Sequence, residues 1–237
     1  MSDFDGTLAP IADRPDLAAL PVETKETLVQ LGRLDKYLLG IVSGRSLEDV
    51  SSRIGIPGLI YAGNHGLEIK GPGIDFVHPG AGEFKQTLQE VDLRLRRELA
   101  DIPGVIIEQK SLTLSVHYRL TPGGLVEGVQ TRFAAAMAPM LAPGKLKITR
   151  GKKVLEVRPQ FDWDKGKAII KLQEMYPETS LTVFFGDDLT DEDGFAVVQD
   201  KGGLAVFVGP AGEPTCALHR LDSPEEVAQT LKLMLEL

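Results

Sequence analysis

Asp3 and Asp5 stand one residue apart near the start of the sequence and are followed by Gly6. Two carboxylates at this spacing can reach one cation, and an all-oxygen cluster suits Mg²⁺. One of them could also attack phosphorus, because aspartate is a nucleophile that forms an acyl phosphate. A solvated acidic turn is the alternative interpretation, and the motif alone does not decide between the two.

A second acidic cluster directly follows the apolar run 181–185. Acidic residues favour the start of a helix, which is enough to account for Asp191 and the two acidic residues after it. Asp187 and Asp188 stand before that helix, and adjacent carboxylates repel each other unless a cation compensates them. We therefore predict a metal near Asp187 and Asp188, because ligands of open α/β sheets lie at the carboxyl ends of the strands.

Two polar positions lie between these clusters. Ser43 follows an apolar run, and its hydroxyl and the next backbone N–H groups could bind a phosphoryl oxygen. Lys165 opens a helical stretch and would add a positive charge against the same group. Each position is weak by itself, since Ser-Gly turns and solvated lysines are common. Their order along the chain gives them value, because each stands at a predicted strand end or helix start.

The elements that must position these residues alternate at both ends of the chain. Apolar runs of this length predict parallel strands buried on both faces, separated by amphipathic helices. Strands are expected over 37–42, 59–62, 181–185 and 204–208, and helices over 22–34, 46–50, 165–176, 190–199 and from 223 onward. The pattern predicts an α/β domain with a central parallel sheet.

The middle of the chain follows another pattern, in which apolar and polar residues alternate over 112–118. Such alternation is typical of an antiparallel sheet covered by helices on one face. Helices are expected over 82–100 and 124–141, and strands over 105–108, 112–118, 145–149 and 154–157. We predict a small α+β domain over 78–158, inserted into a core made of 1–77 and 159–237, with boundaries in Gly/Pro-rich connectors.

Composition excludes several classes of function. The 26 basic and 34 acidic residues give a net charge of −8, which disfavours general binding to nucleic acid. No apolar run approaches the roughly 20 residues of a membrane helix, so no membrane partner is expected. The single cysteine, Cys216, is expected to be a buried small side chain and suits a reducing, cytoplasmic compartment. No pair of histidines has the spacing of zinc ligands.

The ordered motifs resemble those of the haloacid dehalogenase-like (HAD) superfamily. The four motifs match as Asp3-Phe4-Asp5-Gly6-Thr7, Ser43, Lys165 and Gly186-Asp187-Asp188. The insert lies between the second and third motifs, and its α-β-β-α-β-β order resembles a C2B-type cap on a Rossmann-like core. Further strings, at 8–11, 62–68, 116–119, 153–159 and 186–193, narrow the resemblance to the trehalose-6-phosphate phosphatase family.

The resemblance implies a Mg²⁺-dependent phosphatase that hydrolyses trehalose 6-phosphate through an aspartyl-phosphate intermediate. Asp3 would be the nucleophile and Asp5 the acid and base, while Ser43 and Lys165 would bind the phosphoryl oxygens. Asp3, the backbone carbonyl of Asp5, Asp187 and the nearby Asp188 would hold Mg²⁺. Substrate-binding residues are implied at Glu108, Lys110, Lys152 and Glu156 in the insert and at Arg45, Asn64 and His65 in the core.

Alternatives stay open. The substrate could be sucrose phosphate, glucosylglycerol phosphate or mannosyl-phosphoglycerate, or the chain could be a C2B-capped phosphomutase or a sugar-phosphate-binding domain with impaired catalysis. The last is prompted by the N-terminus, since only Met1 and Ser2 precede Asp3, whereas the superfamily's nucleophile ends a longer central strand. We expect the sequence to begin downstream of its natural start. The expected partner is a small-molecule sugar phosphate, and a monomer is compatible with the sequence.

Overall fold

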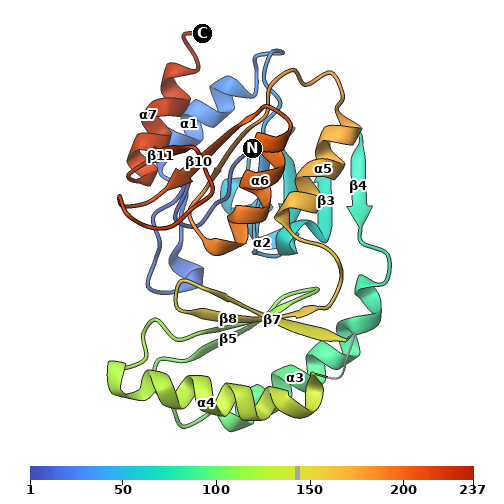
Figure 1. Ribbon diagram of the computed structural model, residues 1–237, viewed down its shortest axis with the longest axis vertical. Coiled ribbons are helices and arrows are strands. Elements are labelled where there is room, and N and C mark those ends of the chain that lie inside the picture. Colours follow the sequence, from blue (N-terminus) through green and yellow to red (C-terminus); the bar gives the residue numbers. More distant parts are fainter. Residues whose placement is uncertain (142–144) are drawn as a thin grey trace. The chain divides into compact units, whose positions relative to one another are not determined.

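The computed structural model describes residues 1–141 and 145–237. These residues form two units (Figure 1), one made of Met1–Val77 with Trp163–Leu237 and the other of His78–Asp162. The second unit extends beyond position 158, where the sequence suggested a boundary. Its end is held by Phe161, whose ring stacks on His78 with 4.3 Å between ring centroids and meets Phe84 edge-on at 5.3 Å.

The first unit contains a mixed sheet with a parallel centre. Its strands, in order across the sheet, are β4 (Ile74–Val77), β3 (Glu68–Gly71), β2 (Ile60–Gly63), β1 (Gly40–Val42), β9 (Val183–Gly186), β10 (Leu204–Val208) and β11 (His219–Leu221). The pairs β2–β3 and β3–β4 are antiparallel. Pro72 and Gly73 belong to one of the Gly/Pro-rich stretches that were predicted to connect the core and the insert. They instead form the turn of that hairpin, where Gly73 has a φ of 70°.

Residues 1–3 fill the centre of this sheet, between β1 and β9. Because only Met1 and Ser2 precede Asp3, the sequence suggested that the central strand is too short to pair with β1 and β9. Ser2 nevertheless forms parallel bridges to Ile41 on one side and Phe185 on the other. The Val42 N–H donates to the Ser2 carbonyl at 2.9 Å, and the Asp3 N–H donates to the Phe185 carbonyl at 2.8 Å. Asp3 therefore leaves the sheet at the carboxyl ends of its parallel strands.

Helices cover both faces of this sheet because neighbouring strand residues point to opposite sides. Ile41, Phe185 and Val206 belong to one core cluster, with α1 (Val22–Leu31), α2 (Leu47–Ile54) and α7 (Pro224–Leu233). The alternate residues Val42, Phe184 and Phe207 belong to the other, with α5 (Lys165–Met175) and α6 (Glu192–Asp200). Short 3₁₀ turns lie at η1 (Pro15–Leu17), η2 (Asn64–Gly66) and η6 (Leu189–Asp191). The predicted α/β sheet is confirmed.

The second unit has the element order that the sequence predicted, α-β-β-α-β-β. Its elements are α3 (Lys85–Glu98), β5 (Ile106–Gln109), β6 (Leu114–His117), α4 (Val126–Met137), β7 (Leu146–Gly151) and β8 (Val154–Pro159), with 3₁₀ turns at η3 (Ala81–Phe84), η4 (Gly123–Leu125) and η5 (Ala138–Met140). The antiparallel sheet has the order β5-β6-β8-β7. Leu114, Val116, Leu155 and Val157 face the helices. The opposite face is left for polar residues.

Two expectations from composition can also be compared with the structure. Among the described residues, no helix is long and apolar enough to cross a membrane. Cys216, expected to be buried, is exposed. The reason is its place in the loop before β11, where its backbone N–H donates to Glu192 Oε2 at 2.7 Å.

Candidate active site

Four buried side chains meet at the point where the parallel strands of the first unit end. Lys165 Nζ donates to Asp3 Oδ1 at 2.8 Å and to Asp191 Oδ1 at 2.7 Å. Carboxylate oxygens of Asp3, Asp187 and Asp191 all lie within 4.8 Å of one another. None of the four residues is more than 5 % exposed. The sequence placed Asp3, Lys165 and Asp187 in one site, and the structure brings them together.

Strand ends and helix starts position these groups. Asp187 directly follows β9, and Lys165 is the first residue of α5, whose N-cap Asp164 accepts a hydrogen bond from the Lys167 N–H at 2.8 Å. The Asp191 carboxylate folds back on the same turn. Its Oδ2 accepts the N–H groups of Asp187 and of the residue after it, both at 3.1 Å. Asp191 thus fixes both the strand end and the lysine.

Burial and like charges set the electrostatics of this cluster. Burial raises the pKa of Asp3 well above its usual range, Asp191 and Asp187 raise it further, and the Lys165 ammonium opposes them. Burial alone would lower the pKa of Lys165, but the carboxylates of Asp191 and Asp3 outweigh it and raise that pKa. The lysine is therefore charged, and this one ammonium group faces the buried carboxyl groups of Asp3, Asp187 and Asp191.

Asp191 is the site residue that sequence reasoning missed. A helix start explained it adequately, yet it is fully buried and lies in the cluster. The side chains of two other residues predicted near the metal have partners of their own. Asp188 caps η6, accepting the Leu189 N–H at 2.8 Å, and the Asp5 carboxylate is held by Arg45. The spacing Asp187-x-x-x-Asp191 was the signal available, since one turn of chain brings both carboxylates to the same strand end.

The donor set fits a divalent cation. It consists of carboxylate oxygens with no nitrogen or sulfur ligand, which is the chemistry that Mg²⁺ prefers. Gly6 leaves room for the Asp187 carboxylate, because a Cβ at this position would lie 2.1 Å from Asp187 Oδ2. The Thr7 hydroxyl supports the same carboxylate, donating to Asp187 Oδ1 at 3.5 Å. Asp3, Asp187 and Asp191 are the residues that could hold the ion.

Gly6→Ala should therefore disturb the cluster beyond its effect on the backbone. Gly6 has a φ of 83°, which costs an alanine about 1–3 kcal/mol, and the new methyl group would also displace Asp187. Gly58→Ala is the matched control, because Gly58 has a φ of 84° and nothing within 4 Å of its Cβ position. We expect added Mg²⁺ to raise the melting temperature of Gly58→Ala and not that of Gly6→Ala. Equal Mg²⁺ responses in the two variants would contradict the assignment.

Ser43 lies at the end of β1, where its Oγ accepts the Arg45 N–H at 3.2 Å. Among the described residues its own hydroxyl proton donates no bond, so it is available to a ligand oxygen. The neighbouring turn is unusual, because Asn64 and His65 both have positive φ, 49° and 57°. The Asn64 side chain donates to Glu68 at 2.7 Å, and a Cβ on Gly44 would lie 2.9 Å from the His65 ring. Asn64 and His65 thus belong to a turn that packs against the turn containing Ser43.

In the second unit, polar residues form a row across the sheet face opposite the helices. Glu108, Ser115, Glu156 and Thr149 are successive partners in the strand register. Glu156 Oε1 accepts Lys110 Nζ at 3.0 Å, and both side chains are 8 % exposed. His117 contacts Glu108 at 2.8 Å. We call Glu108, Ser115, Glu156 and Thr149, with Lys110, the polar row.

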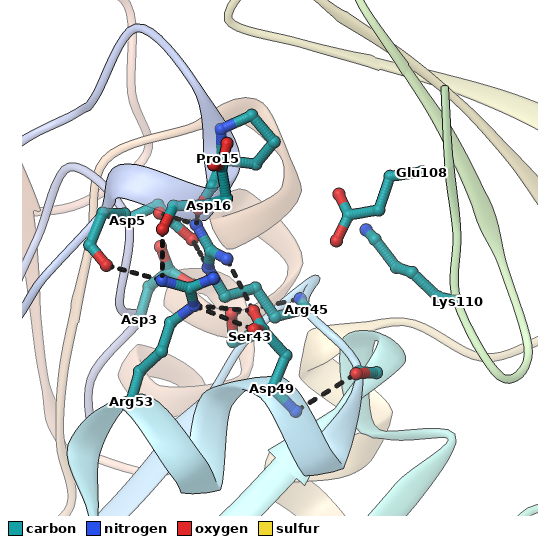
Figure 2. Close-up of polar contacts among 12 residues, drawn as sticks. Asp3, Asp5, Pro15, Asp16, Ser43, Arg45, Asp49, Arg53, Glu108 and Lys110 are labelled. Atoms are coloured by element: carbon teal, nitrogen blue, oxygen red, sulfur yellow. Dashed lines mark hydrogen bonds and ion pairs between the residues drawn. The ribbon is translucent and has the colours of Figure 1, made fainter. Parts of the chain in front are cut away.

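The structure brings together most of the predicted residues of the second unit. Glu108 and Lys110 leave the chain at the end of β5 on the same side, as residues two apart in an extended segment should (Figure 2). Lys152 lies further along the strands, in the turn between β7 and β8. Its backbone carbonyl accepts a hydrogen bond from Arg119 Nη2 at 2.7 Å. The polar row is therefore built by Glu108, Lys110 and Glu156, with Lys152 at the tip of the hairpin.

The fold and the buried acidic cluster define the class of protein. A haloacid dehalogenase-like hydrolase from Bacteroides thetaiotaomicron has a similar fold, with a TM-score of 0.65 at 17 % sequence identity, covering 98 % of this chain and 97 % of that one. The Candida albicans trehalose-6-phosphate phosphatase C-terminal domain is more similar. Its TM-score is 0.87 at 27 % identity, covering 100 % of this chain and 91 % of that one. The fold is that of the HAD superfamily.

Sequence comparison identifies the family within that superfamily. The family model described as trehalose-phosphatase matches residues 1–224, so the chain belongs to the trehalose-phosphatase family. A trehalose-phosphate phosphatase of Mycobacterium bovis is 37 % identical over 96 % of this chain and 58 % of the relative. A probable trehalose-phosphate phosphatase D of Arabidopsis thaliana is 36 % identical over 99 % of this chain and 66 % of the relative. The chain thus spans about three fifths of the length of these relatives.

Proposed function

We propose that this protein is a Mg²⁺-dependent phosphatase that hydrolyses trehalose 6-phosphate to trehalose and phosphate. The observation that carries the proposal is the contact of Lys165 with Asp3 inside the buried acidic cluster of a trehalose-phosphatase family member. Asp3 lies at a strand end with a charged lysine at 2.8 Å, which suits a nucleophile whose phosphorylated form must be neutralised. The intact cluster also argues against a binding domain that has lost its catalytic groups.

In the proposed reaction, the Asp3 carboxylate attacks phosphorus and the bond from phosphorus to the sugar oxygen breaks. Asp5 gives that oxygen a proton and then accepts one from the water that hydrolyses phosphorylated Asp3. Lys165 and the Ser43 hydroxyl bind the phosphoryl oxygens, so the chain contributes mainly position and charge, as phosphoryl transfer requires. A bound Mg²⁺, held by Asp3, Asp187 and Asp191, would supply further positive charge against these oxygens.

The cation should stabilise the fold, and its effect should grow with pH. Because folding raises the pKa of Asp3, the folded state binds more protons than the unfolded one above the ordinary carboxyl range. The free energy of unfolding therefore falls as the pH rises from the ordinary pKa of an aspartate to the raised pKa of Asp3. A bound cation offsets this loss. At a hundredfold excess over its dissociation constant, Mg²⁺ should raise the melting temperature by about 5–10 °C.

Calorimetry in Mg²⁺ and in a chelator, at mildly acidic and mildly alkaline pH, measures this effect. Asp187→Asn removes one ligand and should lose most of the shift, whereas Asp35→Asn changes an exposed aspartate and should keep it. A shift that is larger in acid than in alkali would contradict the assignment of the cation to these carboxylates.

Sugar recognition is proposed for the polar row of the second unit. A buried Lys–Glu pair on an otherwise polar sheet face offers donors and acceptors fixed in position, which hydroxyl-rich ligands require. The Thr113 hydroxyl at 3.2 Å and the Thr149 hydroxyl at 3.4 Å hold the Glu156 carboxylate in place. The unit would then act as a cap that selects the sugar, while the first unit carries out the chemistry.

Glu156→Gln should weaken sugar recognition without slowing the chemistry. The loss of a charged hydrogen-bond acceptor is worth about 1.5–3 kcal/mol, so the KM for trehalose 6-phosphate should rise about 10- to 100-fold. Turnover of p-nitrophenyl phosphate, which has no sugar, should be unchanged. Glu127→Gln, on the exposed side of α4, is the control. An equal loss with both substrates would indicate damage to the fold instead.

The proposed function is tested by phosphate release from a panel of sugar phosphates, with Mg²⁺ and with a chelator. Trehalose 6-phosphate should be the preferred ester, and chelation should stop the reaction. Release from sucrose phosphate or glucosylglycerol phosphate alone would reassign the substrate, and an isomerised product without phosphate release would indicate a mutase. A folded protein that releases no phosphate from any ester would overturn the proposal.

A further inference from the structure

The guanidinium of Arg45 is almost fully occupied within the first unit. Its Nε donates to Asp5 Oδ2 at 2.6 Å and its Nη2 to Asp5 Oδ1 at 2.7 Å, so both carboxylate oxygens are held by one planar group (Figure 2). Nη1 donates to Asp49 at 2.6 Å and Nη2 also donates to the Pro15 carbonyl at 2.9 Å. A guanidinium has five N–H groups, and four are used here. Little is left for a substrate.

Arg45 is itself fixed from two directions. On the side of α2, Asp49 accepts Arg53 Nε at 2.9 Å as well as Arg45. On the side of the loop before α1, Arg53 Nη1 donates to the Ala18 carbonyl at 2.8 Å, next to the Arg45 bond with Pro15. The Arg45 side chain is 7 % exposed, against 36 % for Asp5. The arginine is thus rigid and enclosed, while the carboxylate that it holds reaches solvent.

We propose that Arg45 is a positioning residue for Asp5, which it holds ready to activate the hydrolytic water, and that it does not bind substrate. The inference rests on the proposed function. Two parallel charge-assisted hydrogen bonds fix both the position and the plane of a carboxylate. The remaining lone pairs of Asp5 face solvent, where a water can approach.

The Arg45-bound form of Asp5 suits the second half of the reaction. A guanidinium donates hydrogen bonds and accepts none, so it fixes both Asp5 oxygens as acceptors in one plane. In that step the water oxygen bonds to phosphorus as the bond from phosphorus to Asp3 breaks. The water proton passes to Asp5, and Asp3 leaves as a carboxylate.

The half-reactions can be separated with ³²P-labelled p-nitrophenyl phosphate, whose leaving group needs no proton. Rapid acid quenching measures the fraction of enzyme that carries phosphate on Asp3. In Arg45→Gln we expect the first release of nitrophenolate to keep its rate, turnover to fall about 10- to 100-fold, and phosphorylated enzyme to accumulate above the wild-type level. Arg45→Lys restores the charge without the two-point geometry, so it should recover only a small part of the turnover.

Arg96→Gln is the control, because it removes an arginine from an i,i+4 ion pair with Asp92 in the second unit and leaves the network around Arg45 in place. It should keep wild-type turnover, without accumulation of phosphorylated enzyme.

Three results would overturn the inference while leaving the proposed function standing. They are a higher KM without accumulation, equal slowing of both half-reactions in Arg45→Gln, and full activity of Arg45→Lys. A wild-type protein that releases no phosphate from any ester would instead overturn the proposed function, and the inference with it.

Discussion

Asp3→Asn should abolish phosphate release while leaving the fold intact. Asparagine has nearly the same shape, but its amide cannot attack phosphorus, so activity should fall by about 10⁴-fold or more. No phosphate should become covalently bound to the variant. Both results can be read from one labelled phosphate ester, by counting released phosphate and phosphate that remains on the protein after acid quenching.

The stability of this variant gives a second, independent result. Burial raises the pKa of Asp3, with Asp191 and Asp187 adding to the effect, so the site disfavours its charge. In a chelating buffer above neutral pH, the neutral amide should leave the melting temperature unchanged or raise it. Asp35→Asn, on the surface, should keep full activity and the wild-type melting temperature. Normal turnover in Asp3→Asn would remove Asp3 from the mechanism, and a large fall in stability would contradict the electrostatic description.

Lys165→Met should have the opposite effect on stability. The lysine is 2 % exposed and bonds both Asp3 and Asp191, so a methionine of similar length leaves two buried carboxylates without their cation. Removing one partner from a buried ion pair costs about 3–5 kcal/mol. We expect the variant to lose activity and to unfold at a much lower urea concentration than the wild type.

Lys167→Met provides the comparison, since Lys167 lies two residues further along α5 and is exposed. Its unfolding midpoint should match the wild type to within a few tenths of a molar in urea. Mg²⁺ should restore part of the stability of Lys165→Met, because the cation compensates the same carboxylates. A midpoint equal to that of Lys167→Met would show that the buried network stabilises the fold much less than its geometry indicates.

The sequence predicted the fold where residue patterns reflect burial. The apolar run before Asp187 became β9, and the alternation over 112–118 became β6, because hydrophobic periodicity depends mainly on which face is buried. The hairpin β3–β4 was missed, since Gly71 to Gly73 reads equally well as a connector or as a tight turn. Only the pairing with β2 distinguishes the two, and that pairing is not local in sequence.

The candidate site was predictable in part for the same reason. Asp3, Ser43 and Lys165 stand at strand ends or helix starts, where the sequence marks them directly. Asp191 also fits the pattern of a helix start, and this explains its position without any role in the site. Its hydrogen bond with Lys165 depends on the packing of α5 against η6, which the local sequence does not indicate. Arg45 was expected to meet substrate, and nothing in its local sequence indicates that Asp5 lies 2.6 Å away.

Phe76 stacks on Trp163 with 5.5 Å between ring centroids. These two residues lie where the chain leaves the first unit and where it re-enters it. With the two ends held this close, the intervening residues close a loop whose entropic cost rises only slowly with its length. A segment of very different size could therefore be exchanged at this junction without rebuilding the sheet. The ring pair makes the second unit a replaceable module, so the unit proposed to recognise the sugar could be exchanged, in evolution or in the laboratory, while the acidic cluster stays as it is.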